Sequence, residues 1–137
     1  MVMKSLEDLE KKINSELTTK INNTEIKHNQ ICIETGKEDI IDVAIFLKTN
    51  KDTKFRQLID ITVVDYPEQN QRFEVVYLFL SHEFNQRLIV KYSIAENEVI
   101  PSLTSIFPSA NWMEREVFDM YGVSFKDHPD LRRILTD

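Results

Sequence analysis

A dense group of side chains that could perform acid–base or metal chemistry lies near the C-terminus of this 137-residue sequence. They fall within the segment NWMEREVFDMYGVSFKDHPDLRRILTD, residues 111–137. Three carboxylates lie in its first half, at Glu114, Glu116 and Asp119. His128 follows them, and carboxylates with a histidine can act as general acid and base or bind a metal ion. One hypothesis is therefore a small stand-alone acid–base enzyme that uses these four residues.

The spacing of these groups argues against that chemistry. On a helix, Glu114 and Glu116 point about 160° apart. Helical carboxylate metal sites use a Glu-x-x-His pattern whose ligands converge on one face, and no histidine stands three or four residues from a carboxylate of this helix. A second hypothesis is a solvated helix face, on which Arg115 and Asp119 form a surface ion pair of about 0–1 kcal/mol.

The same segment carries start and stop signals for a helix. Asn111 is a favourable N-cap residue, and Glu114 three residues later could return a carboxylate to it in a capping box. Gly122 stands where helices end in a left-handed residue. These signals predict a helix over residues 112–121. An extended chain is predicted after it, because Pro129 disfavours helical geometry at the residue before it.

The predicted helix is apolar on more than one side. Met113, Val117 and Met120 form one apolar stripe at helical spacing. Trp112 and Phe118 lie outside this stripe. A helix with apolar residues on both sides usually has protein on both sides, which favours an interface over a solvated face.

Length and composition predict a single soluble domain. With 137 residues, of which 42% are hydrophobic and 29% charged, the chain can bury a stable core without disulfides. The net charge of −6 makes free nucleic acid an unfavourable partner, and Arg132 and Arg133 alone do not form a nucleic-acid groove. No stretch has the apolar length of a signal peptide or a membrane span, so we expect an intracellular protein.

Few residues are suited to holding a cofactor. The single cysteine, Cys32, permits neither an internal disulfide nor an iron–sulfur cluster on this chain's own thiolates, and it is expected to be a small buried side chain. The two glycines, Gly36 and Gly122, are too few for a phosphate-binding loop. We therefore expect neither a cluster nor a nucleotide in this chain.

Hydrophobic periodicity predicts one α+β domain over residues 1–137, globular to about residue 124 and extended from about 125 to 137. Its three consecutive strands are joined by turns too short for a crossover helix, so they must form an antiparallel meander. The expected fold has two layers, a mixed or antiparallel sheet with helices on one face, and an extended C-terminal tail. The predicted helices before the last are 5–17 and 37–48, and the predicted strands are 30–34, 57–66, 71–81 and 87–94.

The last quarter of the sequence resembles a known protein family. The run EREVFDMYGVSFKDHPDLRRIL, from Glu114 to Leu135, is similar to the signature of the C subunit of the proton-pumping NADH:quinone oxidoreductase, known as the 30 kDa subunit of respiratory complex I. The preceding PSLTSIFPSANW is also similar to that family, and the residues upstream share its pattern and element order. The family includes counterparts in membrane-bound hydrogenase complexes, which the motif alone does not exclude.

The resemblance implies a non-catalytic scaffold subunit in the hydrophilic arm of the complex, peripheral to the cytoplasmic side of the inner cell membrane. It implies packing on the D subunit, which together with the B subunit frames the quinone cavity, while flavin and iron–sulfur clusters belong to other subunits. Family members usually continue beyond the position of Asp137. The residues expected to be structural or to form the partner interface are Glu114, Arg115, Glu116, Asp119, Gly122, His128, Pro129, Arg132 and Arg133.

Overall fold

Helices and strands follow one another along a mixed α+β chain. The computed structural model describes residues 5–126. In chain order the elements are α1 (Leu6–Glu16), β1 (Ile21–Lys27), β2 (Gln30–Thr35), a 3-10 turn (Lys37–Asp39), α2 (Ile40–Thr49), β3 (Gln57–Asp65), β4 (Phe73–Ser81), β5 (Gln86–Ile94), β6 (Val99–Pro101), α3 (Ala110–Tyr121) and β7 (Ser124–Lys126).

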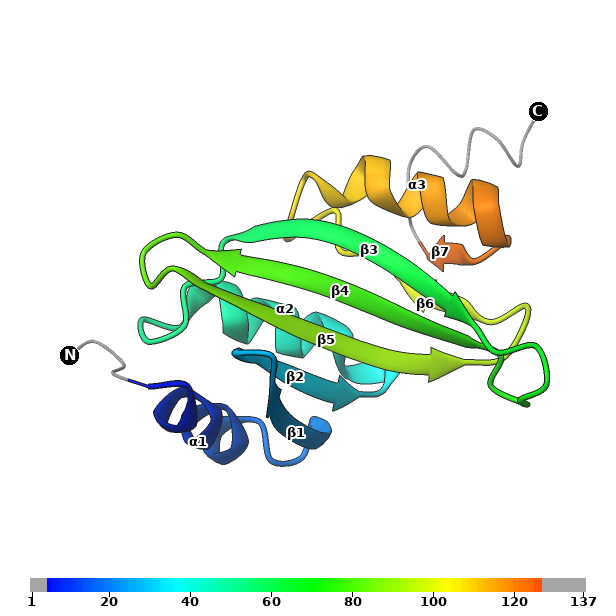
Figure 1. Ribbon diagram of the computed structural model, residues 1–137. Coiled ribbons are helices and arrows are strands. Elements are labelled where there is room, and N and C mark those ends of the chain that lie inside the picture. Colours follow the sequence, from blue (N-terminus) through cyan, green and yellow to red (C-terminus); the bar gives the residue numbers. More distant parts are fainter. Residues whose placement is uncertain (1–4, 127–137) are drawn as a thin grey trace.

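A five-stranded mixed sheet forms the centre of the domain (Figure 1), with the strand order β1-β2-β5-β4-β3. The pairs β1–β2, β5–β4 and β4–β3 are antiparallel, whereas β2–β5 is parallel. The short strands β6 and β7 form a separate parallel pair. The predicted α+β class, the mixed sheet and the antiparallel meander of β3, β4 and β5 are confirmed.

Within the described residues, the large sheet has one buried face and one open face. Along β4, every second residue from Phe73 to Ser81 is buried, and the residues between them are partly exposed. β5 and β2 largely follow the same alternation, which is the pattern of a sheet covered on one side. The ring contacts Phe73–Tyr121 and Phe79–Phe107 join the buried face to α3 and to the loop before it. In Figure 1 the strands β4 and β5 pass in front of α2.

All three helices contribute to one hydrophobic core. α1 begins where the predicted helix 5–17 begins, with Ser5 as its N-cap, and Ser5 Oγ accepts a hydrogen bond from Asp8 N at 3.2 Å. Its Leu9 and Ile13, about one turn apart, are buried. α2 follows the 3-10 turn, and together they account for the predicted helix 37–48. The buried side of α2 consists of Ile40, Val43, Ala44 and Leu47.

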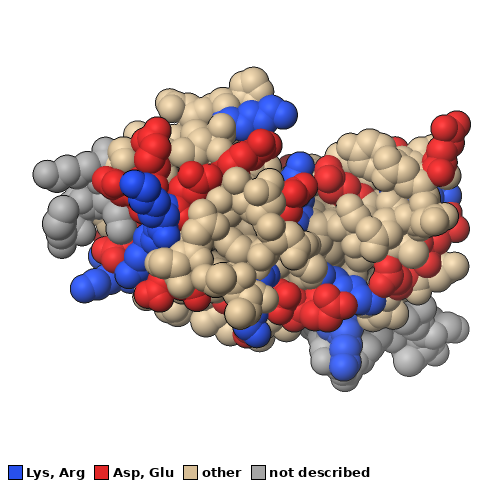
Figure 2. Space-filling view, turned by 90° about the horizontal axis from the view of Figure 1, so that it is seen from below, with Lys and Arg blue, Asp and Glu red and all other residues tan. Residues whose placement is uncertain are grey.

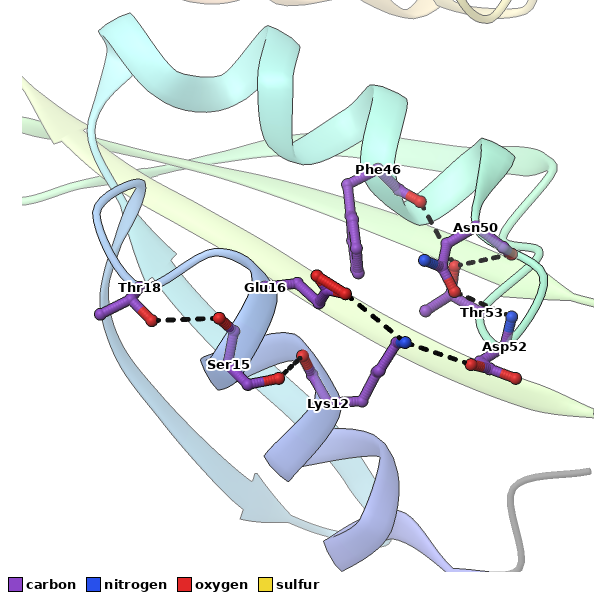
Figure 3. Close-up of polar contacts among 8 residues, drawn as sticks. All are labelled: Lys12, Ser15, Glu16, Thr18, Phe46, Asn50, Asp52 and Thr53. Atoms are coloured by element: carbon purple, nitrogen blue, oxygen red, sulfur yellow. Dashed lines mark hydrogen bonds and ion pairs between the residues drawn. The ribbon is translucent and has the colours of Figure 1, made fainter.

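Polar contacts join α1 to the loop after α2 (Figure 3). Lys12 Nζ on α1 lies 3.4 Å from the carboxylate of Asp52 in that loop. Asn50 Oδ1 accepts a hydrogen bond from Asp52 N at 2.9 Å. Thr53 is fully buried, and its hydroxyl donates to the carbonyl of Leu47 at 2.7 Å. The buried hydroxyl is thereby satisfied where the chain leaves the helix.

The sequence analysis did not predict β1, β6 and β7. β1 (INNTEIK) is an edge strand in which no residue is fully buried, so it lacks the apolar alternation of the central strands. β6 and β7 have three residues each, too few for a periodicity to register. The globular part extends at least to β7, because Phe125 is 4% exposed within the core. Residues 127–137, which hold the remainder of the predicted tail, lie outside the described part of the chain.

Thr53→Val should destabilise the domain by about 1 kcal/mol, because an isosteric methyl group cannot replace the buried hydrogen-bond donor. Thr49→Val is the matched control. The Thr49 hydroxyl donates to Ile45 O at 2.7 Å on the exposed side of α2, so its loss should change the stability by no more than about 0.5 kcal/mol. Urea unfolding of the two variants measures the difference, and equal losses would contradict it.

Candidate functional site

Helix α3 holds most of the described residues that the sequence singled out. It packs against β3. Its inner side buries Ala110, Glu114 and Val117. Its outer side exposes Trp112, Glu116, Asp119 and Met120. The acidic residues of the motif are therefore divided between the interior of the domain and its surface.

The N-terminus of α3 lies at Ala110, earlier than predicted. The N-cap is Ser109, whose hydroxyl donates to the carbonyl of Leu58 on β3 at 3.0 Å. The prediction that Asn111 caps the helix is wrong. Phe107 and Ala110 are both buried, and their packing starts the helix before Asn111.

Glu114 is a carboxylate with no exposed surface. Its Oε1 accepts a hydrogen bond from Ser102 Oγ, and its Oε2 accepts one from Leu103 N, each at 2.7 Å. Ser102 Oγ also lies 2.9 Å from Thr104 Oγ1. The predicted capping box is wrong, because Glu114 points into the domain and binds the loop that precedes α3. This anchor was missed by sequence reasoning, since a capping box and an internal anchor use the same residue types.

Two tyrosine hydroxyls form a second buried polar contact. Tyr77 Oη on β4 and Tyr92 Oη on β5 are 2.8 Å apart. Burial raises the pKa of Tyr77 well above its usual value, and Tyr92 and Glu114 raise it further. Burial also raises the pKa of Tyr92. Both phenols therefore stay neutral and serve as a hydrogen-bonded pair within the core. The alternation of β4 and β5 was the only sequence signal for this pair.

Two large apolar side chains lie on the outer side of α3. Trp112 is 66% exposed and Met120 is 72% exposed. The exposure of Trp112 agrees with its predicted place outside the apolar stripe, whereas Met120, which was predicted within the stripe, is exposed although Val117 is buried. The last turn of α3 is instead held by Tyr121, whose ring packs against that of Phe73 in a T-shaped arrangement with 6.0 Å between centroids.

The charged residues of α3 do not form a catalytic or metal-binding cluster. Glu116 and Asp119 are exposed, and no ion pair joins Asp119 to Arg115 in the structure. Both oxygens of Glu114 already accept hydrogen bonds. Within residues 5–126, no group of three His, Cys, Asp or Glu side chains is placed to hold a metal ion. The described carboxylates therefore do not converge on a reaction centre.

The helix ends at Gly122, as predicted. This residue has a left-handed φ of 72°, and its amide donates to Phe118 O at 2.8 Å. A side chain at this position would meet no atom within 4 Å. Gly122 is therefore required for its backbone conformation, because the left-handed region disfavours residues with a Cβ.

Two shallow grooves flank Met120. One lies between α3 and β3, and the other is lined by Arg72 and Tyr121. Arg72 makes a bidentate contact with Asp65, at 2.6 and 2.9 Å, and also pairs with Glu96. These contacts fix the β3–β4 hairpin beside the C-terminal end of α3. Arg72 lowers the pKa of Asp65, chiefly through this hydrogen bond.

The remaining predicted residues, His128, Pro129, Arg132 and Arg133, lie outside the described residues.

On the face shown in Figure 2, Lys and Arg side chains are interspersed with Asp and Glu, so this face presents no continuous basic groove. None of the helices within residues 5–126 combines the length and the apolar character that crossing a membrane requires.

Comparisons with known proteins identify the family. The family profile described as "Respiratory-chain NADH dehydrogenase, 30 Kd subunit" matches residues 33–137. The chain belongs to this family. It is 53% identical over 114 residues to the NADH-quinone oxidoreductase C subunit of Dinoroseobacter shibae, and the match covers 83% of this chain and 53% of that relative. It is 44% identical over 135 residues to the protein of the same name from Rhodospirillum rubrum, with 98% and 63% covered.

Solved structures share the fold. A trypsin-resistant fragment (1–134) of Nqo5 has a TM-score of 0.75 and 26% identity, and the match covers 88% of this chain and 97% of that one. A chain of the membrane-bound sulfane sulfur reductase, an archaeal respiratory membrane complex, has a TM-score of 0.78 and 24% identity, with 89% and 71% covered. This second likeness is one of fold alone. The predicted membership of the 30 Kd subunit family is confirmed, and the chain spans between about half and two thirds of the length of the Dinoroseobacter and Rhodospirillum relatives.

Glu114→Ala should destabilise the isolated chain by about 2–4 kcal/mol, because the Leu103 amide and the Ser102 hydroxyl lose their hydrogen-bond acceptor inside the core. Glu116→Ala is the matched control, since it makes the same change on the exposed side of the same helix. It should alter the stability by no more than about 0.5 kcal/mol. Urea unfolding measures both, and a small loss in Glu114→Ala would show that α3 does not need this anchor.

Proposed function

We propose that this chain is a non-catalytic scaffold subunit of an NADH:quinone oxidoreductase. Its family and the names of its relatives support this assignment. One observation supports the scaffold role, namely the exposed apolar side chains on the outer side of α3. It belongs to the segment that resembles the family signature, yet it exposes two large apolar side chains, Trp112 and Met120, beside carboxylates that do not converge.

The composition of this surface favours a protein partner. Aromatic residues and methionine are enriched in the buried centres of interfaces, and charged residues lie at the rim. Trp112 and Met120 lie two turns apart on one rigid helix, with Glu116 and Asp119 on the same side. A tryptophan held on a helix loses little conformational freedom on binding, so it is well suited to anchor a partner.

The partners that we propose are the D and B subunits of the complex, in the hydrophilic arm at the cytoplasmic side of the membrane. The chain would support electron transfer from NADH to quinone by holding these two proteins in place, and it would reach the membrane only through them. Arg115, on the flank of the outer side of α3, and the motif residues Arg132 and Arg133 would add charged contacts to the same interface.

We also propose that the flavin and the iron–sulfur clusters of the complex lie in other subunits. One cysteine and two glycines supply too few thiolates for a cluster and too few flexible positions for a phosphate-binding loop. The purified chain should therefore be colourless. An absorption spectrum after purification tests this, and a stoichiometric flavin or cluster band in the visible range would contradict the scaffold role.

Trp112→Ala should weaken assembly with the D subunit by roughly 30-fold or more, the effect of losing about 2 kcal/mol at an interface anchor. The change should leave the melting temperature of the isolated chain nearly unaltered, because this side chain is largely exposed. The measurement is affinity capture of the D subunit, encoded in the same genome, after co-expression with each variant.

Ile45→Ala is the matched control, because Ile45 is an exposed apolar residue (43%) on α2 rather than on α3. Equal capture by wild type, Trp112→Ala and Ile45→Ala would show that the outer side of α3 is not the interface. Co-purification of a hydrogenase-type large subunit in place of the D subunit would assign the chain to that class of complex.

A further inference from the structure

The open face of the large sheet carries an apolar strip at its centre. Cys32 on β2, Ile89 on β5 and Leu78 on β4 are neighbours in register across three adjacent strands. Val76 and Leu80 extend the strip along β4 on either side of Leu78. These five side chains are only partly exposed, and they lie on the face opposite to the one that α3 covers.

The sequence of β4 indicates that this strip is covered in the assembled protein. All six residues from Val75 to Leu80 are apolar. Continuous apolar runs are typical of strands that are covered on both faces, whereas a strand with one solvated face alternates with polar residues. Within residues 5–126, the helices cover only one of the two faces.

The dimensions of the strip match a single helix. Val76 to Leu80 span about 14 Å at the rise of a strand, and Cys32 to Leu78 span about 10 Å across two strand spacings. A helix with its side chains is about 10–12 Å wide and covers 14 Å in roughly nine residues. The strip therefore has the width of one helix and the length of two to three turns.

Charges at the edges of the strip define the chemistry of that helix. The register that joins Cys32, Ile89 and Leu78 continues to Glu25 on β1 at one end and to Asp60 on β3 at the other. Neither carboxylate forms an ion pair with the described residues. A helix on the strip would place its flanks beside these two carboxylates, so basic residues on both flanks would be complementary to them.

The cations of this face do not alter that conclusion. Lys91 pairs with Glu74 at 3.8 Å. Arg87 lies opposite Leu80, at one end of the strip, and Lys27 lies opposite Gln30 on the neighbouring strand pair. Positive charge at that end is complementary to the C-terminus of a helix, which carries a partial negative charge.

A second copy of the chain fits this face less well than a helix. The apolar strip measures only about 10 by 14 Å in outline, or roughly 140 Å², so even the larger accessible area of its side chains is far below that of a dimer interface. A stable dimer buries about 800 Å² on each partner. A helix that belongs to a partner already bound elsewhere does not have to supply a complete interface here.

We propose that the open face of the sheet, at Cys32, Val76, Leu78, Leu80 and Ile89, seats one amphipathic helix of a partner protein, with an apolar stripe and basic residues on both flanks. This inference rests on the proposed subunit role and adds a second interface, on the opposite face of the sheet from α3. The chain would then be held between two partner segments.

Cys32 is the single cysteine of the sequence, so the rate of its alkylation measures how accessible the strip is. Burial raises the pKa of its thiol, so the free chain and the complex must be treated at the same pH. We expect iodoacetamide to alkylate Cys32 in the free chain. In the respiratory complex purified through this chain, the reaction should be at least about tenfold slower, because access limits it.

Equal rates, with the partner subunits present, would overturn this inference and leave the proposed function intact. Purification of the chain without any partner subunit would overturn both.

Two further measurements identify what covers the strip. A photoreactive benzoylphenylalanine in place of Ile89 should cross-link, in the complex, to a peptide of another subunit with apolar residues at helical spacing and Lys or Arg on both flanks. A cross-link to a second copy of this chain, or to a segment without basic flanks, would overturn the inference.

Asp60→Lys tests the charge at the edge of the strip. It should accelerate alkylation of Cys32 in the complex several-fold while leaving the rate in the free chain unchanged. Glu7→Lys, at an exposed position on α1, is the control and should leave both rates unchanged. Full protection of Cys32 in Asp60→Lys would show that the flanking charge does not contribute.

Discussion

The hydrogen bonds of the buried Glu114 carboxylate determine which side of α3 faces the solvent. Both oxygens are bound at 2.7 Å, by the Ser102 hydroxyl and the Leu103 amide. A carboxylate without exposed surface is costly unless such groups satisfy it, so this geometry restricts the rotation of α3 about its axis. With Glu114 directed inward, Trp112 and Met120 must lie on the outside. The outward direction of these two large apolar side chains is thus a consequence of one internal polar contact.

This arrangement gives different physical roles to residues that are close together in the motif. Glu114 supports the fold, whereas Glu116, two residues later, is exposed. Gly122 ends the helix in a left-handed conformation that needs no side-chain contact. Glu114 is therefore separated in space from Glu116 and Asp119, which removes the geometric basis for an acid–base mechanism that combines all three carboxylates of α3.

The parts of the fold that sequence could predict are those in which one periodicity dominates. The Ser5 cap with Leu9 and Ile13 defines α1, and the alternation of Phe73, Val75 and Tyr77 defines β4. The face of α3 could not be predicted in the same way. Met113, Val117 and Met120 have the spacing of a stripe, but a buried glutamate competes with methionine for the inner side, and hydropathy assigns the glutamate to the surface. Two of the groups that bind that glutamate are a loop hydroxyl and a loop amide, and neither leaves a periodic signal.

A domain that remains alone in water would differ at two surfaces, the open face of the sheet and the outer side of α3. Its central strand would alternate polar and apolar residues, but β4 carries Val76, Leu78 and Leu80 on the face that the described helices leave open. Its last helix would present charged residues outward, but α3 presents Trp112 and Met120. Both features lie on rigid elements, the middle of a sheet and a helix anchored at Glu114. Apolar surface on rigid elements binds a partner with little further loss of conformational entropy. The exposed apolar side chains that are unfavourable in a domain alone in water are thus the same ones that favour a subunit held between partners.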